Sequence, residues 1–190
     1  MEKLNNEHTA LLVMDVQGAT VKALEEKERF FALLKKAIAA ARENKISVMY
    51  VVVGFRKGYP EVSPHNKMFS SIISGARSFD KDEDFKVAEE VAPQAGDVVI
   101  TKKRVSAFAG SDLEVILRAQ QIQHLVLTGI ATSGVVLSTI GEAADKDYII
   151  TVLSDCCADR DEEVHRVLTT KVFPRQANVT TAEEWRTSLH

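Results

Sequence analysis

Short, almost uninterrupted apolar segments alternate along this chain with longer amphipathic ones. Residues 9–16, TALLVMDV, and 46–53, ISVMYVVV, are apolar nearly throughout, which is typical of parallel strands buried on both faces of a sheet. Between them, from Glu26 onward, apolar residues recur at spacings of three and four, which predicts an amphipathic helix ending near Asn44. A helix between two buried strands predicts a right-handed βαβ unit.

The same alternation continues to the end of the chain. The remaining predicted strands are residues 98–101, 125–127, 149–153 and 177–180. The remaining predicted helices are residues 66–73, 112–121, 135–140, 159–171 and 183–185. Ser111 and Glu114 match a capping box, and Gly129 is expected to end its strand. This order predicts a doubly wound, mostly parallel α/β fold, a three-layer Rossmann-type arrangement, with residues 1–190 as one domain.

Composition narrows the classes of partner. Hydrophobic residues make up 45% of the chain and charged residues 27%, and the net charge of -3 argues against a basic nucleic-acid surface. No apolar run approaches the ~20 residues needed to span a bilayer, and the first residues lack a signal-peptide core. The two cysteines, Cys156 and Cys157, are adjacent and are interpreted as reduced thiols. We therefore expect a cytoplasmic protein that binds a small molecule rather than nucleic acid or a membrane.

Polar residues follow several of the predicted strands. Asp15 ends the first, Lys102 follows the strand at 98–101, and a turn rich in small and hydroxyl residues begins at Gly129. Parallel strands bring their carboxyl ends to one edge of a sheet, so these residues are predicted to meet there. The first N–H groups of the helix after the turn can receive a carbonyl oxygen or an anion. Charges are common at strand ends, but their joint occurrence with the glycine turn predicts a catalytic centre.

Several segments, which together span almost the whole sequence, match the motifs of one family. They are ALLVMDVQ, VVITKKRVSAFAGSDLEVIL, LVLTGIATSGVVLST, SDCCADRDEEVHRVL and NVTTAEEW. With these motifs the chain resembles the isochorismatase-like superfamily of cysteine hydrolases. The resemblance implies that Asp15 is the catalytic aspartate. It also implies that Lys102, four residues before the Ser-Ala-Phe of its motif, is the catalytic lysine rather than Lys103.

The resemblance makes a further expectation for the turn after residues 125–127. The family has Gly-x-Ala-Thr-x-x-Cys there, with a non-proline cis peptide that here would join Ile130 to Ala131. The amides of Ala131 and Val135 would then face one point. Val135 occupies the position of the family's nucleophilic cysteine. An isopropyl group has no lone pair, so a thioester route cannot run through this residue.

Other nucleophiles and bases are poorly placed in the sequence. Thr132 and Ser133 share the turn but lack an obvious base to activate them. Cys156 and Cys157 follow the next strand, and the family's layout assigns them to structure. His124 precedes its strand, at the edge of the sheet opposite the predicted site, and is expected on the surface.

Four further residues are candidates for the substrate pocket. They are Gln17, Arg56, Ser106 and Phe108. Arg56 could bind a carboxylate through its bidentate fork or could be a surface arginine. It lies in the irregular segment 54–85, which is either a substrate loop or a plain surface loop.

Metal binding has little support in the sequence. The nicotinamidase branch of the family uses an aspartate and two histidines in a tight cluster, whereas the loop after the second strand contains only His65. His65 is more simply an exposed loop residue. We therefore expect neither a metal nor another cofactor.

The sequence is compatible with three functions. The first hypothesis is a hydrolase of a small, anionic metabolite that uses Asp15 and Lys102 without a cysteine nucleophile, because isochorismatases proper also lack the cysteine. The second is an inactive relative that acts as a small-molecule binding or structural protein. The third, ranked lowest, is amide hydrolysis by an unconventional nucleophile. The apolar helix faces around Phe30 and Val136 also predict a homo-oligomer, because they are larger than the core of a single chain can bury. The resemblance implies the same, since relatives commonly form dimers or tetramers.

Overall fold

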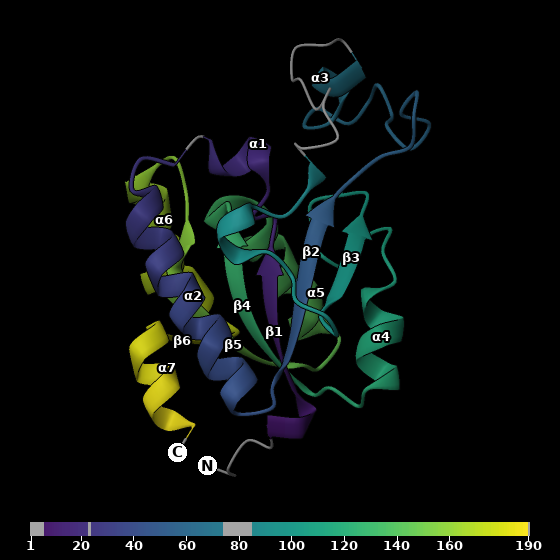
Figure 1. The fold of residues 1–190 in the computed structure, drawn as a ribbon. Coiled ribbons are helices and arrows are strands. Elements are labelled where there is room, and N and C mark those ends of the chain that lie inside the picture. Colours follow the sequence, from purple (N-terminus) through teal and green to yellow (C-terminus); the bar gives the residue numbers. More distant parts are fainter. Residues whose placement is uncertain (1–5, 23, 74–84, 190) are drawn as a thin grey trace.

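The computed structural model describes residues 6–22, 24–73 and 85–189. A six-stranded sheet with the order β3-β2-β1-β4-β5-β6 lies at its centre (Figure 1). The strands are β1 (Thr9–Met14), β2 (Ser47–Val53), β3 (Val98–Lys102), β4 (His124–Ile130), β5 (Ile149–Ala158) and β6 (Asn178–Thr180). All neighbouring strands are parallel, so the predicted doubly wound α/β fold is confirmed.

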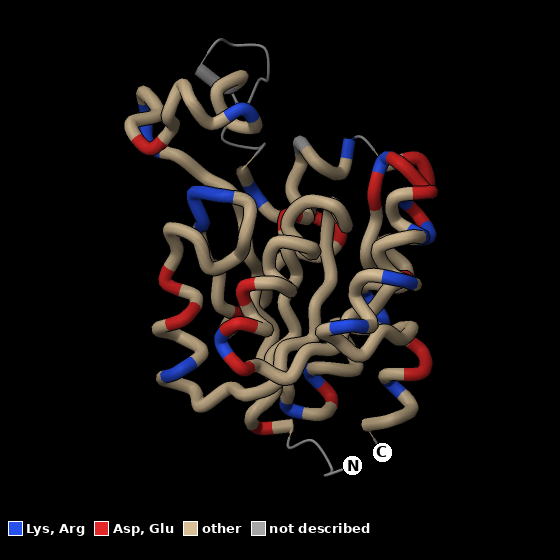
Figure 2. Tube along the Cα trace, turned by 180° about the vertical axis from the view of Figure 1, so that it is seen from behind, with Lys and Arg blue, Asp and Glu red and all other residues tan. Residues whose placement is uncertain are grey.

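Helices cover both faces of this sheet. The described helices are α1 (Gly18–Val21), α2 (Lys27–Glu43), α3 (Ser70–Ile73), α4 (Leu113–Ala119), α5 (Leu137–Asp145), α6 (Glu162–Val167) and α7 (Ala182–Ser188). Of these, α1 and α3 lie beyond the carboxyl ends of the strands instead of over a face (Figure 1). None of these described helices is long and apolar enough to cross a membrane. Lys and Arg are scattered along the described chain (Figure 2).

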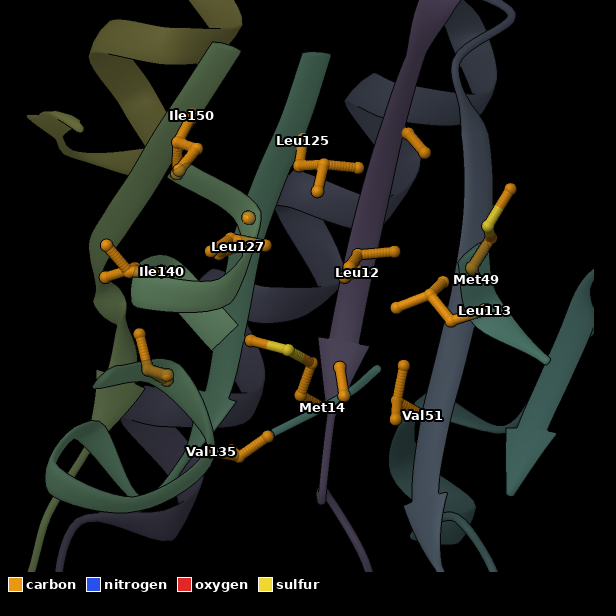
Figure 3. Close-up of a cluster of buried hydrophobic side chains, with 14 of the residues drawn as sticks. Leu12, Met14, Met49, Val51, Leu113, Leu125, Leu127, Val135, Ile140 and Ile150 are labelled. Carbon is orange, nitrogen blue, oxygen red and sulfur yellow. The ribbon is translucent and has the colours of Figure 1, made fainter. Parts of the chain in front are cut away.

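The sheet separates two apolar cores. Leu11 and Val13 of β1 point to one face and pack with α2 and α7, whereas Leu12 and Met14 point to the other and pack with α4 and α5 (Figure 3). Successive side chains of a strand alternate between faces, so a strand covered on both sides must be apolar throughout. Each fully buried Leu or Met contributes about 1.5–3 kcal/mol relative to an exposed one. The continuous apolar run of β1 is therefore the physical reason for the three layers.

The direction of winding reverses between β1 and β4. The chain passes from β1 outward to β2 and β3, and then returns to place β4 on the other side of β1. In open α/β sheets, ligands bind outside the carboxyl ends of the strands at such a switch point. Asp15 follows β1 and Ala131 follows β4, so both flank this crevice.

Gly129 does not end β4, as the sequence suggested, but lies inside it. The strand continues to Ile130, and its register with β5 shifts between Leu127 and Gly129. Gly129 has φ +140°, and a Cβ atom at this position would lie 2.1 Å from the carbonyl oxygen of Met14. Only glycine lets the end of β4 approach β1 this closely.

Three other local predictions are wrong. The helix at α4 begins after Asp112, and the Ser111 hydroxyl donates to the carbonyl of Ala107 instead of forming a capping box with Glu114. The helix expected from residue 159 begins only at Glu162, because β5 runs on to Ala158. His124 is not on the surface: it is 4% exposed and is hydrogen-bonded to two threonines, Thr9 and Thr151.

Candidate active site

The two charged residues predicted from the sequence form an ion pair. Asp15 immediately follows β1 and Lys102 is the last residue of β3, so the lysine side chain extends past the intervening strand β2. Its Nζ atom lies 2.9 Å from Oδ2 of Asp15. Both residues are buried, with exposed fractions of 1% for Lys102 and 8% for Asp15. The carboxyl ends of separate strands thus bring an acid and an amine together.

Lys102 has a full set of hydrogen-bond acceptors. Besides Asp15, its Nζ donates to the carbonyl oxygens of Arg104 and Val105, each at 2.8 Å. An ammonium group has three N–H donors. All three are used within the protein, so Lys102 orients the carboxyl group and has no donor left for a substrate anion.

Asp15, in contrast, has a free oxygen. Among the described residues, its buried Oδ1 atom has no hydrogen-bond partner. Burial raises the pKa of Asp15 to about 6, against the opposing effects of the charge and hydrogen bond of Lys102 and of the nearby Val53 backbone. A carboxyl group with such a pKa can both donate and accept a proton near neutral pH. The free Oδ1 is the position at which it can do so.

The turn after β4 passes beside this crevice. A cis peptide joins Ile130 to Ala131, and a π-type turn, Thr132–Val136, leads into α5. Within the turn, the carbonyl oxygen of Ala131 accepts from the N–H groups of Gly134 and Val136, at 3.0 and 3.3 Å. The turn is therefore closed on itself by backbone bonds.

Val135 lies in the apolar core. It is 1% exposed and lies beside Met14 in the cluster on the α5 face of the sheet (Figure 3). Its side chain contains only carbon, so this part of the turn offers packing but no nucleophile.

Gln17 is a positioning residue in this geometry. It is completely buried; its Oε1 accepts from the backbone N–H of Val53 at 2.8 Å, and its Nε2 donates to the Val53 carbonyl at 3.1 Å. Val53 pairs with Lys102 in the sheet register. Gln17 therefore ties the segment after β1 to the strand that separates Asp15 from Lys102.

The other candidate pocket residues contact different parts of the molecule. The Arg56 side chain is 74% exposed and pairs with Glu61 at 2.5 Å. The Ser106 hydroxyl donates to Glu142 of α5 at 2.6 Å. Phe108 stacks against Tyr148, with ring centroids 6.0 Å apart. These contacts do not bring the three residues to the Asp15 carboxyl group.

Residues that can bind a metal are dispersed. His65 is exposed, in the loop after β2. Within residues 6–22, 24–73 and 85–189, no three His, Cys, Asp or Glu side chains are grouped so that they could hold a metal ion.

Two residues near the turn were missed from the sequence. The backbone N–H of Ser133 donates to Oδ2 of Asp159 at 2.7 Å, and the Thr132 hydroxyl is hydrogen-bonded to Nδ1 of His165 at 2.8 Å. Asp159 directly follows β5, but the sequence predicted that this strand ends at residue 153, so the strand-end rule that selected Asp15 did not reach it. Thr132 thus has a neighbouring base, contrary to expectation, although its side chain is completely buried.

Comparisons with known proteins agree with this architecture. A family model for the isochorismatase domain matches residues 9–184. Ureidoacrylate amidohydrolase RutB of Serratia proteamaculans is 32% identical over 171 residues, which cover 78% of this chain and 69% of that protein. YwoC of Bacillus subtilis, an uncharacterized isochorismatase family protein, is 30% identical over 177 residues, which cover 93% of this chain and 92% of that protein.

Solved structures extend the agreement to three dimensions. N-carbamoylsarcosine amidase from Thermoplasma acidophilum superposes with a TM-score of 0.76 at 28% identity, covering 92% of this chain and 96% of that one. A cysteine hydrolase from Pseudomonas syringae pv. phaseolicola has a TM-score of 0.87 at 24% identity, covering 100% of this chain and 95% of that one, and shows the shared fold. With the family model spanning residues 9–184, the chain belongs to the isochorismatase family.

Proposed function

We propose that this protein hydrolyses a small metabolite by proton transfer through Asp15, without a covalent thioester intermediate. The observation that carries the proposal is the buried Asp15 carboxyl group, which has one oxygen held by Lys102 at 2.9 Å and the other free among the described residues. Relatives named as amidohydrolase and amidase support hydrolysis as the type of reaction.

The geometry suits a substrate that needs an acid rather than a nucleophile. Vinyl-ether hydrolysis begins when an acid protonates a carbon of the double bond. Water then adds to the resulting cation and returns a proton to the carboxylate, and the adduct collapses to a carbonyl compound and an alcohol. Asp15, with a pKa of about 6, can serve as this acid and be restored in each cycle.

Neither cysteine supplies a substitute nucleophile. Both are buried in β5, with exposed fractions of 0% for Cys156 and 6% for Cys157. Burial raises the pKa of both thiols, that of Cys157 to about 12, so the reactive thiolate is scarce at neutral pH. A cysteine-free route agrees with Val135, the residue that the resemblance matches to the family's nucleophilic cysteine.

An anionic substrate would need other contacts than Lys102. Because the donors of Lys102 are all used, we propose that the backbone amides of the turn, at Ala131 and Val135, receive the substrate's negative group.

The test is a hydrolysis screen with purified protein over vinyl ethers, amides and ureas, each in anionic and neutral form. Wild type is compared with Asp15→Asn, which keeps the side-chain shape but cannot transfer the proton. Asp155→Asn is the matched control, because Asp155 lies on β5 and its Oδ1 accepts from Ala182 N–H at 2.8 Å, a bond that Asn can keep. We expect Asp15→Asn to lower kcat by at least about a hundredfold, and the control to stay near wild type.

A binding protein without activity is the second candidate. The observation that favours it is the close packing of Val135, which leaves its position in the turn without a reactive side chain. Tight binding of a compound from the same screen, with no turnover of any compound and equal binding by Asp15→Asn, would establish this alternative.

We also propose that the chain forms a homo-oligomer, on different grounds from those first expected. Phe30 and Val136 are buried within the single chain, so they provide no surface for a second copy. Exposed apolar side chains lie instead at Val99 of β3, 50% exposed, and Val115 of α4, 71% exposed. Light scattering should give a mass of at least twice 21.0 kDa, and a monomer would refute the proposal.

A further inference from the structure

The turn Thr132–Val136 is held from outside by one short segment of the chain. This segment, residues 159–165, follows β5 and begins α6. Its first residue, Asp159, accepts the Ser133 N–H at 2.7 Å, and its last, His165, is hydrogen-bonded to the Thr132 hydroxyl at 2.8 Å. Thr132 and Ser133, which are consecutive in the turn, are therefore each held by a side chain of this segment, His165 and Asp159 respectively.

The turn needs such support because its backbone is irregular. Gly134 has φ -102° and ψ -105°, outside the helical region, and it interrupts the regular pattern of backbone hydrogen bonds before α5. The first N–H groups of any helix have no intrahelical partner. Here Asp159, on another element, supplies the acceptor for the N–H of Ser133.

The contacts of Asp159 and His165 are both of a kind that holds the turn in one position. Although burial opposes it, the bonds that Asp159 accepts from Ser133 and the following backbone hold its pKa below the ordinary value, so it is a carboxylate at neutral pH. A carboxylate near the first N–H groups of a helix is favoured by the helix dipole and makes a charge-assisted bond. Thr132 is 0% exposed, so its hydroxyl has no access to water in place of His165.

We infer that Asp159 and His165 are positioning residues that fix the turn whose amides we propose to receive the substrate's negative group. The inference rests on the proposed function for its consequence in hydrolysis, but the positioning itself does not. Both residues also line a cavity of about 560 Å³ between β5, α2 and α6. Because this space is open, shortening either side chain removes a hydrogen bond without removing a densely packed part of the core.

The test measures amide hydrogen exchange across residues 132–136 in the intact protein, which requires no substrate. Asp159→Ala and His165→Leu should each speed exchange in the turn by about tenfold, the factor expected for the loss of one hydrogen bond. Asp159→Asn and His165→Asn keep a polar group near the lost atom and should restore most of the protection. If His165→Leu does not fold, the nearly isosteric Thr132→Val removes the same bond from the other side.

Asp161→Ala is the matched control. Asp161 lies in the same segment and accepts the Val164 N–H at 3.1 Å, so this variant loses a helix-capping bond that does not touch the turn. Unchanged exchange in Asp159→Ala and His165→Leu, or an equal rise in Asp161→Ala, would overturn the inference. With an anionic substrate in hand, the two positioning variants should raise KM about tenfold with less than a twofold change in kcat, because the turn amides are proposed to receive the substrate's negative group. A lower kcat with an unchanged KM would also contradict the inference.

Discussion

At the scale of single residues, Asp15 is subject to two opposing effects. Removal from water favours the neutral acid, whereas the ammonium of Lys102 at 2.9 Å favours the carboxylate. The sequence shows that both effects exist but gives no relative size. In the folded protein burial has the larger effect, and the pKa of Asp15 is about 6. The same side chain is therefore a usable acid and a usable base.

Replacing Lys102 by Met should give a loss of stability that depends on pH. At pH 8 the variant buries a carboxyl group without its counter-charge, which costs roughly 3 kcal/mol. At pH 5 Asp15 is largely protonated and needs no counter-charge, so the loss should be clearly smaller. Urea unfolding at both pH values measures the difference.

Lys103→Met is the control for this prediction. Lys103 is adjacent in sequence and donates to the Gly54 carbonyl at 2.7 Å, and it forms no ion pair with a carboxylate of the described residues. The loss of stability in Lys103→Met should be the same at both pH values. Equal losses at pH 5 and pH 8 for Lys102→Met would mean that Asp15 does not titrate in this range.

The residue-level site could be predicted only in part. Asp15 and Lys102 were found because strand ends share an edge of a parallel sheet, a rule that needs no side-chain coordinates. The roles of Asp159 and His165 depend on contacts with a backbone N–H and a buried hydroxyl of another element, and these leave no periodic signal in the sequence. Ser106 is directed to α5 by Glu142, a long-range contact of the same kind.

At the scale of elements, a close backbone approach joins the ends of β1 and β4. Met14 pairs with Gly129 in the register, and the absent side chain of the glycine lets the Met14 carbonyl lie against it. This approach sets the distance between Asp15, one residue after Met14, and the turn that starts after Ile130. The shape of the site is thus determined by a backbone contact.

Gly129→Ala should destabilise the protein by about 3 kcal/mol or more, because the new Cβ would overlap the Met14 carbonyl at a backbone φ that alanine avoids. Gly141→Ala provides the contrast within the next element. Gly141 lies inside α5, where an added Cβ would meet no atom within 4 Å, and alanine should stabilise the helix by roughly 0.5–1 kcal/mol. Thermal unfolding would distinguish the two, and similar effects at both positions would contradict the close approach.

The elements themselves were largely predictable, since strands buried on both faces must be apolar. The residues at which the strands and helices begin and end were less predictable. β5 extends through Asp155, Cys156 and Cys157 to Ala158 because it follows β4 past a register shift, and periodicity does not reveal a register shift. Likewise, α6 begins late because Asp161 caps it by accepting the Val164 N–H.

At the scale of the whole molecule, the two edges of the sheet have different chemistry. The carboxyl edge carries Asp15 and Lys102, and the amino edge carries His124, which is bonded to Thr9 of β1 and Thr151 of β5. One imidazole thus connects three neighbouring strands. Burial lowers the pKa of His124 to about 4, so it is neutral at pH 7.

The buried His124 lowers the stability of the folded protein in acid. The unfolded chain binds a proton at His124 below about pH 6.5, whereas the folded chain resists protonation until about pH 4. Its contribution is therefore complete above pH 6.5 and is lost between these values, by up to roughly 3 kcal/mol. Asp15 has the opposite effect between pH 4 and 6: because its pKa is raised in the folded state, its contribution to stability increases as the pH falls. This contribution cancels when two variants that both contain Asp15 are compared.

His124→Gln should consequently be less stable than wild type at pH 7, with a difference that shrinks as the pH falls to 4. Denaturant unfolding across this range measures it. His65→Gln, in the exposed loop after β2, should run parallel to wild type. A constant difference for His124→Gln would show that the buried imidazole does not resist protonation.

The protein's proposed activity depends on a carboxyl group that stays poised near neutral pH inside the fold. The most direct measurement is the titration of the Asp15 carboxyl carbon by NMR, with Asp15→Asn used to assign the signal. The expected midpoint is about 6, the result of burial exceeding the attraction of Lys102. A midpoint at or below about 4, the ordinary range of an aspartate, would mean that Asp15 is only the ionised partner of a structural salt bridge, and would contradict its role in proton transfer.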